Sequence, residues 1–141
     1  MSQEVQEMSA AKALVFVVDD DFDDLEIIKQ ILETGGYRTS CFTDPMEALE
    51  QMAEEKPRLV ITDLMMKFID TGLSFTRQIK FDPRFERIPV ILITAAFSRR
   101  EFPIQPQTSD DLMKMGIDAY FDKPVTAEKL LGKVRQLLGD T

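Results

Sequence analysis

Three carboxylates, Asp19, Asp20 and Asp21, stand together directly after a continuous apolar run, and a fourth, Asp63, ends a second such run. Carboxylate oxygens are weak nucleophiles. Phosphoryl transfer nevertheless depends mainly on positioning and charge neutralisation, so an aspartate beside a cation can accept a phosphoryl group. We therefore interpret Asp63 as a candidate phosphoryl acceptor that needs a cation beside it.

Two later apolar runs are also followed by polar side chains, Thr94 and Lys123. The Thr94 hydroxyl can donate a hydrogen bond to one phosphate oxygen, and the Lys123 ammonium can pair with another. Each of these residues, taken singly, has an ordinary structural interpretation. An acidic residue after a strand is often a helix cap, a threonine can simply end a strand, and Lys123-Pro124 can be a turn.

The chain contains no histidine and one cysteine, Cys41. This composition excludes an internal disulfide, a zinc site built from Cys and His, and any mechanism that needs a histidine base from this chain. A bound metal would have oxygen ligands, which favours magnesium, calcium or manganese. We expect Mg²⁺, with Mn²⁺ able to substitute, held by Asp20 and Asp63, with Asp19 acting directly or through water.

The elements around these residues alternate between strand and helix. Continuous apolar runs predict buried parallel strands, and the more polar run from Tyr37 to Phe42 predicts an edge strand. Helical spacing of apolar residues, closed by signals such as Gly35-Gly36, predicts the helices. The expected strands are 14–18, 37–42, 58–63, 89–94 and 118–122, and the expected helices are about 22–34, 45–53, 73–81, 109–115 and 127–138, with a loop over residues 64–72 before the third helix.

This alternation predicts an α/β fold, a flavodoxin-like (βα)5 arrangement whose doubly wound parallel five-stranded sheet has the order 2-1-3-4-5. In that order strands one and three are neighbours, and ligands bind at the carboxyl ends of the strands where the winding reverses. The rule brings Asp19, Asp20 and Asp63 to one edge of the sheet, with Thr94 and Lys123 arriving from the other side. We therefore interpret these residues as one joint site.

The composition of the 141-residue chain is that of an ordinary globular domain, with 44% apolar and 30% charged residues. A net charge of −8 and a pI near 4.6 argue against nucleic-acid binding, which needs clustered Lys and Arg. The longest apolar runs are too short to span a bilayer, and the first ten residues do not resemble a signal peptide. We expect no membrane partner and a cytoplasmic location.

Four segments that carry these residues resemble, in order, the receiver domain of two-component response regulators. The likeness covers about Ala13 to Leu138, so we expect a flexible N-terminal tail over residues 1–11 and a receiver domain over residues 12–141. The matching segments are Val17-Val18-Asp19-Asp20-Asp21, Leu59-Val60-Ile61-Thr62-Asp63-Leu64-Met65-Met66, Pro89-Val90-Ile91-Leu92-Ile93-Thr94-Ala95 and Gly116-Ile117-Asp118-Ala119-Tyr120-Phe121-Asp122-Lys123-Pro124.

The resemblance implies a role for each residue at the acceptor. Asp63 corresponds to the phosphoacceptor, supplied by a phosphohistidine on a histidine kinase or a histidine phosphotransfer protein. Asp19 and Asp20 correspond to the acidic pair on the magnesium side, with the backbone carbonyl of Met65 as a further ligand. Lys123 corresponds to the lysine that binds the phosphoryl group, and the family usually has a cis peptide bond after it.

The resemblance also implies how phosphorylation would be reported. Thr94 and Tyr120 correspond to a switch pair that reorients and changes the face formed by the fourth predicted helix, the fifth strand and the last helix. An unknown downstream protein would read that change. The chain departs from the family pattern at Lys67 and at Gly72, which stands one residue further along the chain than the pattern has it. The segment at residues 97–108 is also longer than in the family. We interpret that segment as either a tolerated insertion or a modified partner-binding face.

Other functions remain open from the sequence. The chain could be a stand-alone phosphorylation switch or a receiver cut from a longer regulator, and in neither case an enzyme acting on a separate substrate. It could be a pseudo-receiver that only binds proteins. It could also be an aspartate-nucleophile phosphohydrolase, in which Asp19 rather than Asp63 would be the nucleophile.

Overall fold

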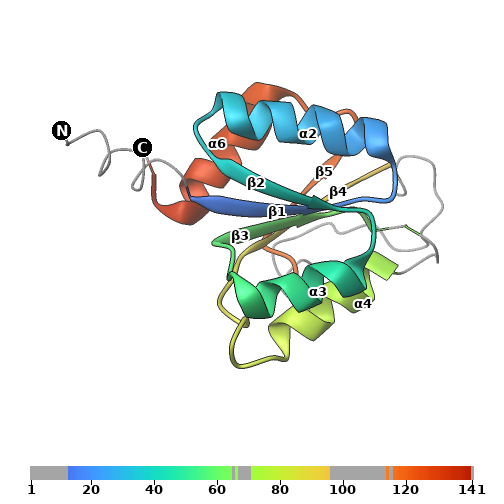
Figure 1. The fold of residues 1–141 in the computed structure, drawn as a ribbon. Helices are drawn as coiled ribbons and strands as arrows, with labels where there is room; N and C mark the ends of the chain where they lie inside the picture. Colours follow the sequence, from blue (N-terminus) through green and yellow to red (C-terminus); the bar gives the residue numbers. More distant parts are fainter. Residues whose placement is uncertain (1–12, 65, 67–70, 96–113, 115, 141) are drawn as a thin grey trace.

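A single parallel sheet organises the fold. The computed structural model describes residues 13–64, 66, 71–95, 114 and 116–140, and five strands among them pair in the order β2-β1-β3-β4-β5 (Figure 1). The predicted fold class and strand order are confirmed. The strands are β1 (Leu14–Val18), β2 (Arg38–Phe42), β3 (Leu59–Thr62), β4 (Val90–Thr94) and β5 (Ala119–Asp122).

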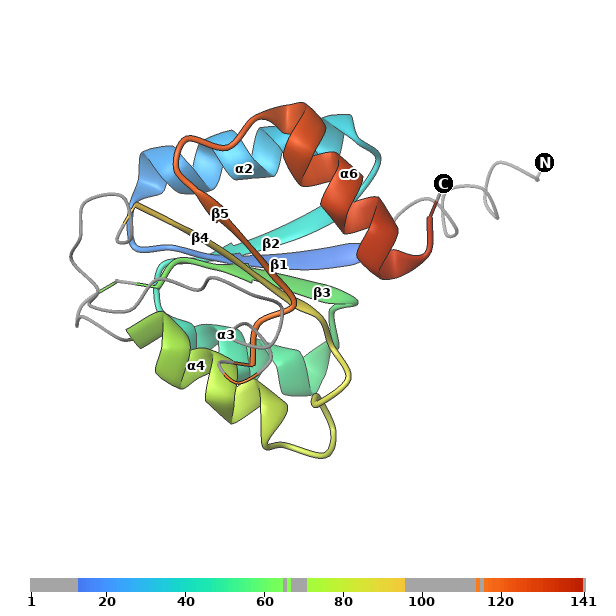
Figure 2. The same ribbon diagram turned by 180° about the vertical axis from the view of Figure 1, so that it is seen from behind.

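Helices cover both faces of the sheet. In the described part of the chain, α2 (Phe22–Thr34) and α6 (Ala127–Leu138) lie on one face, and α3 (Pro45–Glu54) and α4 (Thr71–Lys80) on the other (Figures 1 and 2). Because side chains alternate along a strand, neighbouring strand residues belong to different cores. Val15 and Val17 pack in the cluster with the residues of α2 and α6, and Phe16 packs in the cluster with those of α3 and α4.

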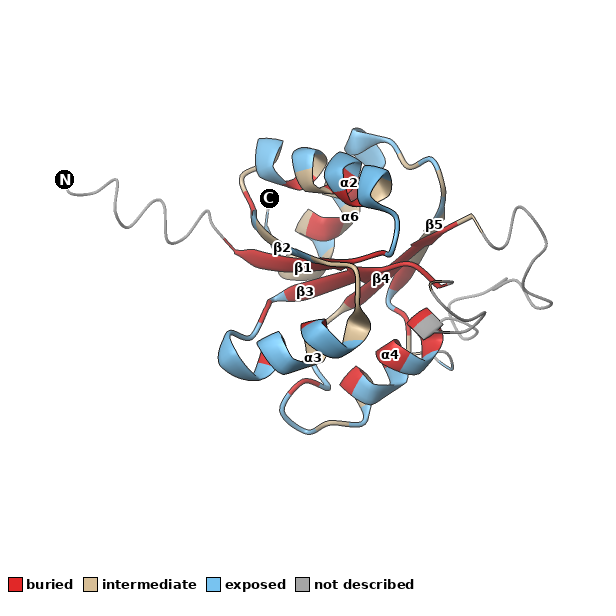
Figure 3. Ribbon diagram, turned by 45° about the vertical axis from the view of Figure 1, so that its right-hand side comes forward, coloured by how far each residue is buried: buried red, intermediate tan, exposed pale blue. Residues whose placement is uncertain are grey.

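Burial follows the position of each strand in the sheet. Every residue of β1, β3 and β4 is buried, whereas no residue of β2 is (Figure 3). This difference explains why the central strands are continuous apolar runs and β2 is more polar. The prediction of β2 as an edge strand is confirmed.

The helix ends use the capping residues that the sequence indicates. The side chain of Asp44 accepts a hydrogen bond from the backbone amide of Met46 at the start of α3, and Pro45 occupies the first turn. Thr126 caps α6 in the same way, and Gly139 ends that helix in the left-handed conformation, with φ of 74°. These caps fix where the connecting segments enter and leave the sheet.

The predicted start of the third helix is wrong by two residues. That helix was expected from 73, after a loop from 64 to 72, but α4 begins at Thr71. The glycine at position 72 was interpreted as a loop residue, whereas it lies in the first turn of α4 and its amide donates to the Leu64 carbonyl at 2.7 Å. Strand bounds differ from the predictions by one residue at some ends, which is the usual uncertainty in an element boundary.

Some predicted segments lie outside the described residues. These are the tail at 1–11, the segment at 97–108 and the helix at 109–115, apart from Lys114, which is helical. Among the helices that the structure does describe, none is long and apolar enough to cross a membrane.

Candidate functional site

Lys123 lies among three carboxylates at the carboxyl edge of the sheet. Its Nζ donates hydrogen bonds to Oδ2 of Asp19 at 2.8 Å, to Oδ2 of Asp63 at 2.9 Å and to Oδ2 of Asp24 at 2.6 Å. An ammonium has three N–H donors, so these contacts can engage all of them. One cation therefore offsets the repulsion among three neighbouring carboxylates.

Backbone hydrogen bonds continue the sheet up to these side chains. The amide of Asp19 donates to a carbonyl of β2, the amide of Asp63 to a carbonyl of β1, and the amide of Lys123 to a carbonyl of β4, each at 3.0 Å. The peptide bond between Lys123 and Pro124 is cis, as the resemblance implies. Asp19, Asp63 and Lys123 are thus brought together by the strand order, while their chemical roles stay predictions.

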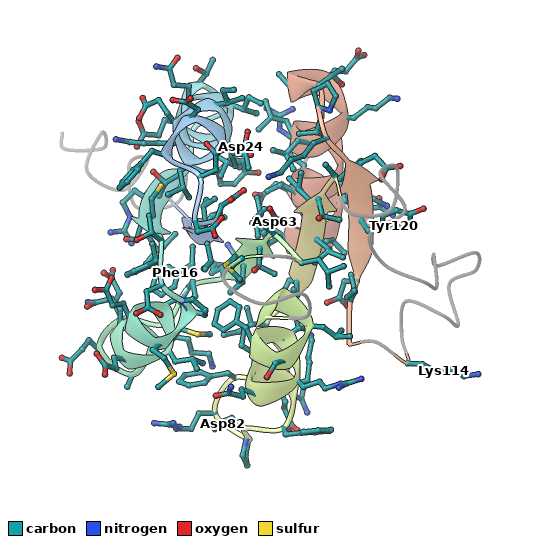
Figure 4. The ribbon with its side chains drawn as sticks, turned by 90° about the vertical axis from the view of Figure 1, so that its right-hand side faces the viewer. Phe16, Asp24, Asp63, Asp82, Lys114 and Tyr120 are labelled. Atoms are coloured by element: carbon teal, nitrogen blue, oxygen red, sulfur yellow. The ribbon has the colours of Figure 1, made fainter. Side chains whose placement is uncertain are left out.

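Asp24 contacts the same lysine from the first turn of α2. Figure 4 labels Asp24 on this helix and Asp63 at the edge of the sheet. Asp21 is the N-cap of this helix, and its Oδ1 accepts the amide hydrogens of Asp23 at 2.9 Å and Asp24 at 3.2 Å. Sequence reasoning missed Asp24. The available signal was its spacing, because Asp24 stands four residues before the buried Ile28 and so shares the helix face that packs against the sheet.

Burial and charge shift the proton affinities of this cluster. Burial raises the pKa of Asp19 to about 6, the charge of Asp63 adds to the rise, and hydrogen bonds from Lys123 and the Asp21 amide oppose it. Burial alone would lower the pKa of Lys123, but its hydrogen bonds to the three carboxylates outweigh that effect and raise it above its usual value. The two shifts agree physically, since deprotonating Lys123 would break three ion pairs whereas protonating Asp19 breaks one.

The raised pKa of Asp19 predicts a pH-dependent stability. A carboxyl with an ordinary pKa of 3.8 and a folded pKa of about 6 binds its proton more tightly in the folded state. Its contribution to the free energy of unfolding is therefore full below about pH 4 and is lost as the pH rises through about 6, a change of about 3 kcal/mol. Asp19→Asn cannot ionise, so we expect its stability to rise relative to wild type across that window.

Urea unfolding of both proteins between about pH 4 and pH 8 measures this difference. The expected result is a gap in free energy of unfolding that grows by about 1–3 kcal/mol in favour of Asp19→Asn as the pH increases. A gap that is constant with pH would contradict the assignment of the titration to Asp19.

The predicted metal ligands differ in how the structure places them. Asp19 and Asp63 are buried, Asp20 is exposed, and Met65 lies outside the described residues. Over residues 13–64, 66, 71–95, 114 and 116–140, no three His, Cys, Asp or Glu side chains are grouped so as to hold a metal ion. The donor chemistry fits Mg²⁺, because the predicted ligands offer only oxygen. Metal binding by this chain stays a prediction.

The predicted switch residues lie on neighbouring strands. Thr94, the last residue of β4, is buried, and Tyr120 on β5 is half-buried. The strands pair Leu92 with Tyr120 and Thr94 with Asp122, so Thr94 and Tyr120 project from the same face of the sheet, one diagonal step apart. This arrangement allows a change at Thr94 to affect the position of Tyr120, and the switch role stays a prediction.

Gly72 packs directly against the backbone of the candidate acceptor. A Cβ atom at this position would lie 1.8 Å from the carbonyl oxygen of Asp63 and 2.7 Å from Cα of Leu64. A side chain of any size is therefore excluded unless the backbone moves. The sequence alone indicated a glycine in a loop, whereas the structure shows that α4 begins against the acceptor segment.

Comparisons with known proteins give the same family from sequence and from structure. The family model described as the response regulator receiver domain matches residues 15–135. The polar-differentiation response regulator DivK of Brucella anthropi is 26% identical over 126 residues, which cover 89% of this chain and 96% of that protein. Its counterpart in Brucella ovis matches with the same identity and coverage.

Two solved structures illustrate the likeness in three dimensions. The signal receiver domain of a signal transduction histidine kinase from Syntrophus aciditrophicus has a TM-score of 0.73 at 29% identity, covering 90% of each chain. The chemotaxis response regulator CheY4 of Vibrio cholerae has a TM-score of 0.73 at 22% identity, covering 90% of this chain and 99% of that chain, and shows the shared fold.

Proposed function

This chain belongs to the family of response regulator receiver domains of two-component signalling, and we propose that it is a phosphorylation switch with Asp63 as the phosphoryl acceptor. The observation that carries this proposal is the 2.9 Å contact between Oδ2 of Asp63 and Nζ of Lys123. The acceptor carboxylate is almost fully buried, with 8% of the residue exposed. A buried carboxylate beside a fixed cation is suited to receive an anionic group.

The proposed reaction is a phosphoryl transfer from a phosphohistidine of a partner protein. A carboxylate oxygen of Asp63 attacks phosphorus, an O–P bond forms and the P–N bond breaks. The electron pair of the broken bond leaves with the imidazole nitrogen, which takes a proton from solvent. The product on this chain is an aspartyl phosphate, and the donor histidine belongs to a histidine kinase or a histidine phosphotransfer protein.

The residues around Asp63 would together offset the negative charge of the transferred phosphoryl group. Asp19, Asp20, Asp63 and the backbone carbonyl of Met65 would hold Mg²⁺ or Mn²⁺, which when bound neutralises charge on the phosphoryl oxygens. Lys123, the residue after β5, supplies a second positive charge, and its contact with Asp19 keeps the ammonium at the acceptor. Thr94 would donate its hydroxyl to a phosphoryl oxygen.

The output of the switch would be a change in protein contacts. Movement of Thr94 toward the phosphoryl group would free space for Tyr120, and the face formed by β5, α6 and the predicted helix at 109–115 would change with it. A downstream protein would bind that face. The net charge of −8 makes nucleic acid an unsuitable partner for this domain, and we expect the exchange with its kinase to occur in the cytoplasm.

Labelling by a small phosphodonor tests the proposed acceptor. Incubation with acetyl phosphate and Mg²⁺, followed by intact-mass measurement, should add one phosphoryl group to wild type and none to Asp63→Asn. Asp44→Asn removes the carboxylate that caps α3, on the face of the sheet opposite α2 and α6, and this matched control should label like wild type. Labelling that persists in Asp63→Asn and disappears in Asp19→Asn would instead favour a phosphohydrolase with Asp19 as nucleophile.

A further inference from the structure

Asp24 makes the shortest of the three contacts to the Lys123 ammonium. The Nζ of Lys123 lies 2.6 Å from Oδ2 of Asp24, against 2.8 Å for Asp19 and 2.9 Å for Asp63. Asp24 also differs in origin, because it comes from α2 whereas the other two carboxylates follow strands. Lys123 is therefore held between the sheet edge and the first turn of a helix.

A role in helix stability alone does not account for Asp24. Acidic residues in the first turn of a helix interact favourably with the positive end of the helix dipole and so stabilise the helix. Asp23 is such a residue, and its side chain is exposed. Asp24 is instead directed toward Lys123, and the Asp21 cap fixes its backbone. The position of this carboxylate is thus set by the lysine rather than by solvent.

The three carboxylates differ in how readily they could release the lysine. The side chains of Asp19 and Asp63 are 2% and 9% exposed, so an unpaired charge there would be buried. The side chain of Asp24 is 31% exposed and borders a surface hollow of about 470 Å³ that Lys123 also lines. Water can therefore solvate Asp24 when its contact with Lys123 breaks, and this contact is the least costly of the three to lose.

We propose that Asp24 is a positioning residue that holds the Lys123 ammonium in the unphosphorylated protein and competes with the incoming phosphoryl group for it. The inference rests on the proposed phosphorylation of Asp63. All three N–H donors of Lys123 have carboxylate partners before transfer, so a bond to a phosphoryl oxygen requires one of them to be given up. Asp24 then stabilises the unphosphorylated state and opposes transfer.

The expected consequence is faster phosphorylation when Asp24 loses its charge. In Asp24→Asn the lysine has one ionic partner fewer, and we expect the maximal rate of phosphorylation by acetyl phosphate at saturating Mg²⁺ to rise about fivefold. Asp23→Asn is the matched control, because it changes the net charge by the same amount at the residue next to Asp24. A general electrostatic effect on the anionic donor would lower the KM for acetyl phosphate in both variants, whereas only Asp24→Asn should change the maximal rate.

Two further variants show whether the effect acts through the lysine. Asp24→Glu restores the charge and should return the maximal rate toward that of wild type. In a Lys123→Met background, Asp24→Asn should have no effect beyond that of Asp23→Asn, because the group for which Asp24 competes is absent. Equal maximal rates for Asp24→Asn and wild type, or a rate increase that persists without Lys123, would overturn the proposal.

A measurement on the wild-type chain makes the inference independent of any variant's folding. The ¹³C resonance of the Asp24 carboxyl should shift when beryllofluoride and Mg²⁺ are added, since Asp24 loses its lysine contact in the adduct. An unshifted resonance in a protein that forms the adduct at Asp63 would overturn the role of Asp24 while leaving the proposed function intact. If wild type forms neither adduct nor phosphoprotein, the proposed function fails, and this inference fails with it.

Discussion

Lys123→Met is expected to destabilise the protein by about 3 kcal/mol at neutral pH and to slow phosphorylation by about two orders of magnitude. Methionine preserves an unbranched side chain of similar length but removes the ammonium. Asp19 and Asp63 then remain as nearly buried carboxylates without the cation that lies within 3 Å of both in wild type. Removing one partner of a buried ion pair leaves an uncompensated charge, which is why the loss of stability is large.

Urea unfolding near pH 7 and near pH 5 measures the stability effect of Lys123→Met. The deficit should shrink at the lower pH, because Asp19, whose pKa is already raised to about 6, can then bind a proton in place of the lysine. Lys129→Met removes the same charge from an exposed position of α6 and should be nearly neutral. Equal effects of the two substitutions would show that Lys123 does not hold the carboxylate cluster together.

Gly72→Ala is expected to destabilise the protein by about 3 kcal/mol through a steric conflict at the acceptor. The added Cβ would lie 1.8 Å from the carbonyl oxygen and 2.7 Å from the carbonyl carbon of Asp63. The atoms that the new Cβ would meet all belong to the backbone, so no flexible side chain can move away to relieve the contact. The substitution should also displace Asp63 and slow phosphorylation.

Gly132→Ala is the matched control, because Gly132 lies within α6 and a Cβ there meets nothing within 4 Å. Alanine is a better helix former than glycine, so this control should raise the free energy of unfolding by about 0.5–1 kcal/mol. Opposite shifts in thermal midpoint for the two variants are therefore expected. A Gly72→Ala protein as stable as Gly132→Ala would show that the start of α4 does not lie against the acceptor backbone.

The sheet could be predicted because parallel strands covered on both faces are continuous apolar runs. Leu14–Val18 and Val90–Thr94 are such runs, and each is buried throughout. Strand order then places the residues that follow these runs at one edge, which is why Asp19, Asp63 and Lys123 were expected together. Their hydrogen bonds agree with that expectation.

Two features of the site were not predicted: helical spacing indicates the helix face that carries Asp24 but not its partner, and the start of α4 depends on a tertiary contact. Asp24 belongs to the first turn of a helix, where acidic residues commonly interact with the helix dipole, and its contact with Lys123 depends on how α2 packs against the sheet and α6. The early start of α4 depends on the backbone of Gly72 meeting that of Asp63, and a lone glycine indicates a loop equally well. The predictions for Met65 and for residues 97–108 lie outside the described residues.

If the side chain of Asp63 becomes an acyl phosphate, reductive trapping can locate the modified residue. Borohydride reduces an aspartyl phosphate to homoserine, which peptide mass spectrometry locates in the chain. After incubation with acetyl phosphate and Mg²⁺, we expect homoserine at position 63 and unmodified aspartate at positions 19, 20 and 24. Homoserine at Asp19 or Asp20, or labelled protein in which position 63 is never reduced, would contradict it.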